Sequence, residues 1–393
     1  MTSTLSGARM RSHNGRLVLA TLRDQALSRR QLAGQLGLTP SAITRIVADL
    51  MERGLVEETG KVTAPGAGRP HTTLGLSDRL AGIGIDARVD RTVLLYTEMG
   101  GTVLHREELP LSTRPSPEEF TATVAAAIRS VAADATHTLT GVGMAFPGQL
   151  TSDRQGVARS HYLGWEHVSL VPELEERLGL PVGLRHVAEC AAIANARQPE
   201  LEDCSRLLHV QVGAGLGLAM TRNRDLDETL PVGWGGGGHV LVGDPTRPCV
   251  CGRRGCVDTV VGFEAIAAPG RAAGITVAPG PDAMQRFAAE VGRAADDEGQ
   301  PWALAVVDEL TEHLARAMAV FVSLEVPDRI TLGGYPLALG ARFLDGVSTR
   351  LAENLASPSP LVTTSIGDRA SSLGAAMVGL NQIMTPTRFE EAV

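Results

Sequence analysis

Three cysteines and one histidine lie within a short, glycine-rich part of the sequence. The histidine is His239, and the thiols follow as Cys249, Cys251 and Cys256. Three thiolates and one imidazole complete a tetrahedral shell around Zn²⁺, which leaves no coordination position for water or a substrate. The segment 239–256 therefore predicts a structural zinc site. The alternative, a group of buried free thiols, is disfavoured by this spacing.

The composition is that of a globular protein with several domains. At about 150 residues per domain, the 393 residues predict two or three domains. The 44% of hydrophobic and 20% of charged residues exclude collagen-like, coiled-coil and wholly disordered classes. The sequence contains neither an apolar run of membrane-spanning length nor a secretory signal. We therefore expect a cytoplasmic, nucleoid-associated protein that does not enter a membrane.

The charge is distributed unevenly along the chain. Up to Asp78 the sequence has ten basic and six acidic residues, a net charge of +4. The whole chain carries −8, so the remainder carries −12. A basic segment on an acidic body is the pattern expected where one end of a protein binds a polyanion such as DNA.

Three helices are predicted within this basic segment. Apolar residues at helical spacing predict a first helix over residues 13–27. Ser28 and Gln31 form a capping box at the start of a second helix, which Gly37 ends in a left-handed turn. Thr39 is a suitable N-cap for a third helix. Two short helices joined by a glycine turn are typical of a helix-turn-helix.

The third helix has an apolar stripe and a polar outer face. The stripe runs from Ile43 to Met51 at helical spacing, so Ser41, Thr44 and Arg45 should point outward. In a helix-turn-helix the early outer face of this helix enters the major groove of DNA. We therefore expect Thr39, Ser41, Thr44 and Arg45 to contact DNA.

The chain after this helix resembles the wing of a winged helix. An alternating run over residues 55–58 turns at 59–60, and the chain returns over residues 72–76 after a Gly-Arg-Pro tip. The tip is narrow and cationic, so we expect Arg69 to enter a minor groove. The alternative is a helical protein-interaction module with a polar loop. DNA binding is favoured because the cap, turn, outer face and wing follow in the right order, and residues 1–78 are predicted to form the DNA-binding domain.

From about Leu80 onward, strand-like runs alternate with helical stretches. Examples of the helical stretches are residues 117–133 and 302–324. Alternation of this kind predicts an α/β body with open sheets. The length of residues 79–393 is sufficient for two such lobes.

The chain resembles the ROK family of repressors, open reading frames and sugar kinases, and in particular its repressor branch with an N-terminal winged helix. This resemblance implies a winged helix-turn-helix followed by a two-lobed, actin-like and sugar-kinase-like α/β body. It rests on the wing, the zinc motif and a series of glycine turns, namely Pro147-Gly148, Leu163-Gly164-Trp165, Gly213 to Gly217, Leu332-Gly333-Gly334 and Leu373-Gly374-Ala375-Ala376.

The chain departs from the kinases of this family where they carry out catalysis. The kinases deprotonate the sugar with the Asp of an Asn-Asp pair, and this chain has His186 and Val187 there. Valine cannot accept a proton, and Glu189 should point elsewhere because two residues turn a helix by about 200°. The first phosphate loop keeps only Asp86, and the second has Ala214 in place of a threonine. We expect no catalytic residue, no bound ATP and no sugar phosphorylation.

The positions that read sugar hydroxyls in the family are also altered. The resemblance places Gly236 where a glutamate is usual and leaves only His239 unchanged. A typical aldohexose is therefore disfavoured, because unmatched polar groups cost about 1 to 3 kcal/mol each. Either a modified or larger ligand uses the space at Gly236, or ligand binding is lost. The ligand contacts expected from the resemblance and from nearby polar residues are His161, Tyr162, His186, His239 and Asp258.

Together these features predict a DNA-binding transcription regulator, a repressor of carbohydrate-related genes that a sugar or sugar-derived effector modulates. We expect a homodimer on a palindromic double-stranded operator, with a tetramer as the alternative. His239 would bind zinc through one ring nitrogen and the ligand through the other, so that ligand binding moves the zinc loop and the interlobe hinge. Two alternatives are an effector-independent regulator and an ATP-dependent sugar kinase.

Overall fold

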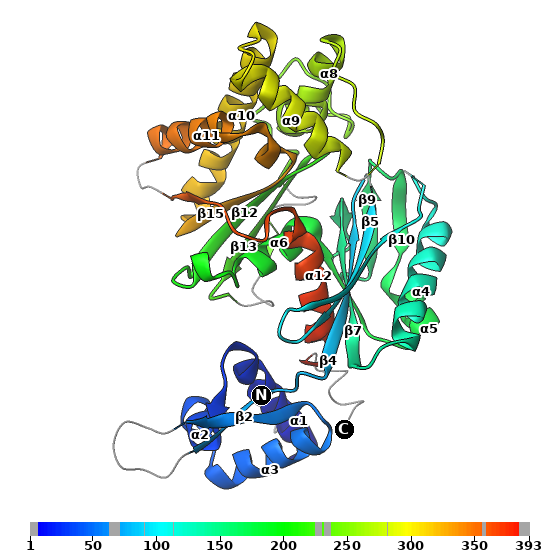
Figure 1. Cartoon of the computed structure of the whole chain (residues 1–393), viewed down its shortest axis with the longest axis vertical. Coiled ribbons are helices and arrows are strands. Elements are labelled where there is room, and N and C mark those ends of the chain that lie inside the picture. The colour runs from blue at the N-terminus through cyan, green and yellow to red at the C-terminus, as the bar shows by residue number, and fades with distance from the viewer. Residues whose placement is uncertain are drawn as a thin grey trace, which may run out of the picture.

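The structure, a computed structural model, has a winged helix at one end and two α/β lobes above it (Figure 1). It describes residues 7–62, 71–89, 91–112, 114–224, 230–231, 237–280, 282–355 and 359–384. Arg69 of the expected wing tip and Gly236 of the expected ligand site lie outside these residues. Among the described helices, none is both long enough and apolar enough to cross a membrane.

The winged helix has three helices and a three-stranded sheet of order β1-β3-β2. The predicted first helix was placed too late in the chain, because Leu27 belongs to a strand and pairs with Leu74. The expected boundary between residues 78 and 79 lies in the connection to the next strand. The elements are α1 (Gly7–Asp24), β1 (Leu27–Ser28), α2 (Arg29–Leu36), α3 (Pro40–Glu52), β2 (Val56–Val62) and β3 (His71–Leu76).

The predicted helix caps of this domain are confirmed. Ser28 and Gln31 form the capping box of α2, and Gly37 ends that helix with a φ of 63°. The Thr39 side chain accepts a hydrogen bond from a backbone N–H in the first turn of α3. On the inner face of α3, Ile43 and Leu50 are fully buried. The two helix caps, the Gly37 turn and the buried face of α3 together fix the orientation of α3 relative to α2.

Lobe 1 is built on a mixed sheet of order β11-β7-β4-β5-β6, with a small sheet of order β10-β9-β8 beside it. Helices α4 and α5 cover one face of the large sheet, where Phe120 and Leu174 are buried (Figure 1). The elements are β4 (Leu80–Ala87), β5 (Thr92–Glu98), β6 (Val103–Leu109), α4 (Pro117–Ala133), β7 (Thr138–Phe146), β8 (Gln149–Leu150), β9 (Gly156–Ser160), β10 (Trp165–Ser169), α5 (Val171–Leu178) and β11 (Val182–His186).

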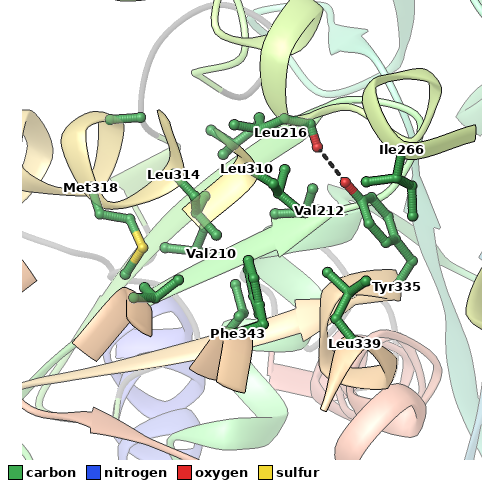
Figure 2. Packing of buried hydrophobic residues seen from close by; sticks show 14 of the residues in the cluster. Val210, Val212, Leu216, Ile266, Leu310, Leu314, Met318, Tyr335, Leu339 and Phe343 are labelled. Atoms are coloured by element: carbon green, nitrogen blue, oxygen red, sulfur yellow. Dashed lines mark hydrogen bonds between the residues drawn. The ribbon is translucent and has the colours of Figure 1, made fainter. Parts of the chain in front are cut away.

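Lobe 2 contains a second mixed sheet, of order β14-β13-β12-β15-β16. Helices α8 to α11 pack on one face of it, and Figure 2 shows this core, in which the Tyr335 hydroxyl donates a hydrogen bond of 2.8 Å to the Val261 carbonyl. The elements of this lobe are β12 (Arg206–Val212), β13 (Leu216–Arg222), β14 (Leu230–Pro231), α7 (Asp258–Val261), α8 (Glu264–Ala272), α9 (Ala283–Asp296), α10 (Pro301–Glu325), β15 (Arg329–Gly334), η2 (Tyr335–Leu339), α11 (Ala341–Asn354) and β16 (Leu361–Val362).

Two helices lie between the two large sheets (Figure 1). They are α6 (Val187–Asn195) and α12 (Ala370–Asn381), and three short 3₁₀ helices complete the chain, η1 (Pro199–Leu201), η3 (Gly367–Arg369) and η4 (Gln382–Met384). Glycines allow α12 to sit directly on its neighbours. A Cβ at Gly143 of β7 would lie 1.9 Å from the Ala375 carbonyl oxygen, and a Cβ at Gly84 of β4 would lie 2.4 Å from the Ala376 backbone nitrogen. Helix α12 is therefore packed too closely to move independently of lobe 1.

Candidate functional site

A cavity of about 340 Å³ lies between the two lobes. Residues at the carboxyl ends of β4, β11 and β15 line it, as do Gly213 to Gly217, which form the turn after β12 and the start of β13. The carboxyl ends of parallel strands form the ligand crevice in open α/β sheets. The five expected ligand residues, His161, Tyr162, His186, His239 and Asp258, all line this cavity. Their role as ligand contacts stays a prediction.

Tyr162 and Asp258 meet across the cavity. Tyr162 follows β9 in lobe 1, and Asp258 is the first residue of α7 in lobe 2; the phenol oxygen lies 3.4 Å from Asp258 Oδ2. Asp258 also accepts a 2.7 Å hydrogen bond from the Leu216 backbone N–H. Burial and the neighbouring carboxylate raise the pKa of Tyr162, and burial raises that of Asp258. Tyr162 therefore remains a neutral hydroxyl that can donate a hydrogen bond.

The glycine loop accommodates these polar side chains. A Cβ on Gly215 would lie 2.5 Å from the Tyr162 hydroxyl oxygen, and a Cβ on Gly217 would lie 2.7 Å from His186 Cε1. Both positions therefore need glycine for reasons that do not involve a phosphate. The loop holds the side chains of Tyr162 and His186 close to its own backbone.

His186 caps helix α6 as well as lining the cavity. Its Nδ1 accepts a hydrogen bond of 3.2 Å from the Ala188 N–H, and Glu189 accepts one of 2.9 Å from the His186 N–H. Burial lowers the pKa of His186, so the ring is neutral and carries its proton on Nε2. Glu189 also binds Arg154, with a shortest contact of 2.8 Å, and does not line the cavity. His186 thus keeps one donor for a ligand.

His161 completes this end of the cavity. Its ring meets that of His239 edge to face, with 6.1 Å between the ring centres. Burial and the neighbouring His239 both lower the pKa of His161. A neutral imidazole has one donor and one acceptor, the combination that suits a hydroxyl group.

The four predicted metal ligands converge at one place. One atom from each of His239, Cys249, Cys251 and Cys256 lies within 4.8 Å of the others. The Cys251 and Cys256 sulfurs are 3.6 Å apart, and His239 Nδ1 is 3.7 Å from the Cys249 sulfur. Zinc with Zn–S bonds near 2.3 Å and a Zn–N bond near 2.0 Å would separate its ligands by about 3.5 to 3.8 Å. The donor set fits Zn²⁺, and the Cys251–Cys256 separation is too long for a disulfide.

The three thiols of the zinc loop differ in their electrostatics, because burial raises the pKa of Cys249 and of Cys256. Burial alone would raise the pKa of Cys251, but hydrogen bonds from the Arg253 backbone and side chain lower it to about 7. Asp258 follows Cys256 by two residues. The loop therefore positions both His239 and Asp258 at the cavity, so that a metal held there would fix one wall of it.

Four of the five predicted DNA-contacting residues lie together at the start of α3, and the fifth, Arg69, is outside the described residues. Thr39, Ser41, Thr44 and Arg45 are all exposed. The Thr44 hydroxyl donates to the Pro40 carbonyl at 2.8 Å, and the Thr39 and Ser41 hydroxyl oxygens are 3.2 Å apart. Thr44 therefore presents an acceptor, whereas Arg45 presents a charged fork of donors.

Sequence reasoning missed the role of Arg88. The degraded phosphate loop after β4 was expected to be merely unable to bind phosphate. Instead Arg88 fills this end of the cavity and donates to Asp86 at 2.9 Å and to Asp368 at 2.7 Å. Burial opposes the charge of Arg88, but these two carboxylates hold its pKa above the usual value. No local signal indicates this contact, because Arg88 and Asp368 are 280 residues apart.

This fold and site define a two-lobed protein of the sugar-kinase type that carries a winged helix. The chain belongs to the ROK family, whose profile matches residues 82–381, and a winged helix-turn-helix DNA-binding profile matches residues 12–57. The predicted family and fold class are confirmed.

Known transcription repressors and known sugar kinases are both similar to this chain. The N-acetylglucosamine repressor of Shigella flexneri is 25% identical over 322 residues, which cover 78% of this chain and 76% of the repressor. A glucokinase of Halalkalibacterium halodurans is 24% identical over 269 residues, which cover 66% and 81% respectively. A ROK family transcriptional regulator, described as a homologue of the Escherichia coli MLC protein, shares the fold with a TM-score of 0.79 at 21% identity, over 98% of this chain and 100% of that one.

Proposed function

We propose that this protein is a sequence-specific transcription regulator, a repressor of carbohydrate-related genes whose DNA affinity depends on a sugar-like effector. The observation that carries the proposal is the exposed polar face of α3, which includes Arg45, in a winged helix joined to a ROK body. One recognition helix reads only a few base pairs. The protein therefore acts as a homodimer on a palindromic operator.

Two features support the loss of kinase activity. Val187 stands where the kinases of the family have the carboxylate that deprotonates the sugar, and Glu189 is bound to Arg154 and to the His186 backbone. Arg88 occupies the end of the cavity next to Asp86. Catalysis of phosphoryl transfer depends on backbone groups that position the phosphates and on a base. At the corresponding positions the cavity is lined by Arg88, which is bound to Asp86, and by Val187.

Zinc has a structural part in this function. His239, Cys249, Cys251 and Cys256 would hold the ion, which would fix the loop from which His239 and Asp258 reach the cavity. The chemistry that zinc supplies is the cross-linking of this loop. An effector that contacts Asp258 would then bind to a part of the cavity that the metal holds rigid.

Selection of genomic fragments by the purified full-length protein tests the proposal. Recovery of a recurrent inverted repeat near transport or hydrolase genes is the expected result, and the neighbouring genes would nominate the effector. Recovery of no shared sequence at low salt would overturn the proposal. Transfer of labelled phosphate from ATP to a sugar would restore the kinase alternative.

The alternative is a DNA-binding regulator that responds to no effector. It is favoured by the altered residues at the positions that bind sugar hydroxyls in the family, and a separate experiment tests it. A thermal-shift panel of sugars and sugar phosphates measures stabilisation by any ligand of the folded state. A rise in melting temperature that Asp258→Asn abolishes supports the effector. A panel without any such rise supports the alternative.

A further inference from the structure

A network of ion pairs and hydrogen bonds joins the two lobes at the end of the cavity nearest β4. We call it the interlobe latch. Arg88 and Arg91 come from the turn between β4 and β5 in lobe 1, and Asp282 and Gln285 come from the start of α9 in lobe 2. Its members are Asp86, Arg88, Arg91, Asp282, Gln285, Asp368 and Ser371.

The latch joins the lobes directly through Arg91 and Asp282, and indirectly through Asp368 of η3. Arg91 pairs with Asp282, and its side chain is only 3% exposed, whereas that of Asp282 is 52% exposed. The Gln285 side-chain amide donates to Asp368 at 3.3 Å. Asp368 also accepts from Arg91 at 2.8 Å. One carboxylate before α12 is thus shared by arginines of lobe 1 and a glutamine of lobe 2.

The closed latch leaves polar atoms unsatisfied. Among the described residues, Asp86 Oδ1, Arg91 Nε and Gln285 Oε1 are buried without a hydrogen-bond partner. Asp86 and Gln285 also line the cavity. Opening the cleft would break the cross-lobe pairs and bring these atoms into contact with water, which can supply the hydrogen bonds.

Helix α12 connects the latch to the winged helix. In its first turn the Ser371 hydroxyl donates to Asp86 at 2.5 Å, and at its last residue Asn381 accepts a hydrogen bond of 3.1 Å from Arg23 of α1. Just beyond, Ile383 and Met384 pack against the winged-helix core. The 12 residues of α12 span about 18 Å, and Figure 1 shows the helix running from between the two lobes toward the winged helix.

Helix α12 packs on β4 and β7 of lobe 1, whereas α6 lies between α12 and the strands β12 and β13 of lobe 2. Lobe 1, α12 and the winged helix can therefore move together as one body relative to lobe 2, with α6 at the boundary. We propose that the interlobe latch sets the angle between this body and lobe 2, and thereby couples occupancy of the cavity to the DNA affinity of the winged helix. The coupling rests on the proposed function. A ligand that contacts both lobes shifts the angle only by its differential affinity for the two arrangements.

The test uses the zinc-loaded full-length chain and the variant Asp282→Asn, which removes a charge from the exposed side of the latch. Asp296→Asn is the matched control, because Asp296 pairs with Arg342 at 2.7 Å within lobe 2. Spin labels are attached through a ketone-bearing amino acid at the exposed Ser130 of α4 and Ser348 of α11. Dilution with unlabelled protein restricts the reading to distances within one chain.

We expect Asp282→Asn to lengthen and broaden the distance distribution between the lobes, and Asp296→Asn to leave it unchanged. We also expect the affinity of Asp282→Asn for a genomically selected DNA fragment to change by about fivefold or more. The double variant with Arg91→Gln should shift the distance no further than the larger single shift, because both changes break the same contact.

The possible outcomes distinguish failure of the interlobe latch from failure of the proposed function. Identical distance distributions for parent, Asp282→Asn and Asp296→Asn would overturn the latch. A shifted distance with unchanged DNA affinity would overturn its coupling to the winged helix. If the distance shifts but no DNA fragment is ever selected, the latch is supported and the proposed function fails.

Discussion

The hydroxyl of Tyr162 lies 3.4 Å from the carboxylate of Asp258, so a side chain of lobe 1 touches one of lobe 2 across the cavity. This contact and the interlobe latch close the cavity at two places. Asp258 is the residue that the zinc loop leads into, and Tyr162 follows β9 of lobe 1. A ligand hydroxyl that entered between Tyr162 and Asp258 would replace one of the two as a hydrogen-bond partner. The cavity could recognise a polar ligand by this exchange.

Tyr162→Phe should lower the free energy of unfolding by about 0.5 to 1.5 kcal/mol, because it removes one hydrogen bond and leaves the packing intact. Urea denaturation measures this change. Tyr335→Phe is the comparison, since its hydroxyl donates at 2.8 Å inside lobe 2. The shorter and fully buried bond of Tyr335 should cost more to remove. An unfolding free energy that rises in Tyr162→Phe would contradict a stabilising hydrogen bond between Tyr162 and Asp258.

Arg45→Ala should weaken binding to the selected operator by about 1 to 3 kcal/mol, or roughly 5 to 150-fold, if the guanidinium contacts a base in the major groove. Fluorescence anisotropy at fixed salt measures the affinity. Arg106→Ala removes the same charge from an exposed position on β6 of lobe 1 and serves as the control. Equal losses in the two variants would show that only the net charge matters, and would remove Arg45 from the recognition surface.

Purified protein should contain about one zinc per chain, and Cys251→Ser should lose it, because an S3N centre has no spare ligand. Elemental analysis counts the metal, and a chelator should lower the melting temperature, since a structural ion stabilises the fold that binds it. Cys204→Ser is the matched control, because Cys204 is buried outside the cluster. Retention of zinc by Cys251→Ser would rule out the proposed coordination.

The features that could be predicted from the sequence are those encoded within a few residues. The capping box of Ser28 and Gln31, the turn at Gly37 and the cap at Thr39 each depend on near neighbours, and each is confirmed. The convergence of the four predicted metal ligands could be anticipated because three of them lie within eight residues of one another. Local hydrogen bonding and ligand spacing are properties of the chain itself.

Contacts between distant segments could not be predicted in the same way. Leu27 forms a strand because it pairs with Leu74, and helical periodicity gave no sign of this pairing. The Tyr162–Asp258 contact joins residues 96 positions apart. His186 is a different case, since a glutamate three residues later marks a capping box even though histidine is an unusual cap. That signal was present in the sequence and was missed.

The buried His209 makes stability depend on pH in a way that the structure predicts. It is a residue of β12 and pairs with Thr331 of β15, with Nδ1 2.9 Å from the Thr331 hydroxyl oxygen and Nε2 3.1 Å from Gln211 Oε1. Burial lowers the pKa of His209 from 6.5 to about 4. The folded state therefore keeps the ring neutral at pH values at which the unfolded chain is already protonated.

Stability from this group is fully present above pH 6.5 and is lost as the pH falls toward 4. The total loss is about 3 kcal/mol. His209→Gln should reduce the pH dependence of the unfolding free energy over this interval, whatever its effect on stability at neutral pH. His105→Gln is the control, because His105 is exposed on β6 and replacing it should leave the slope unchanged. Denaturant titrations at several pH values give the slopes directly, and a slope unaltered in His209→Gln would mean that the ring is protonated in the folded protein or that water reaches it.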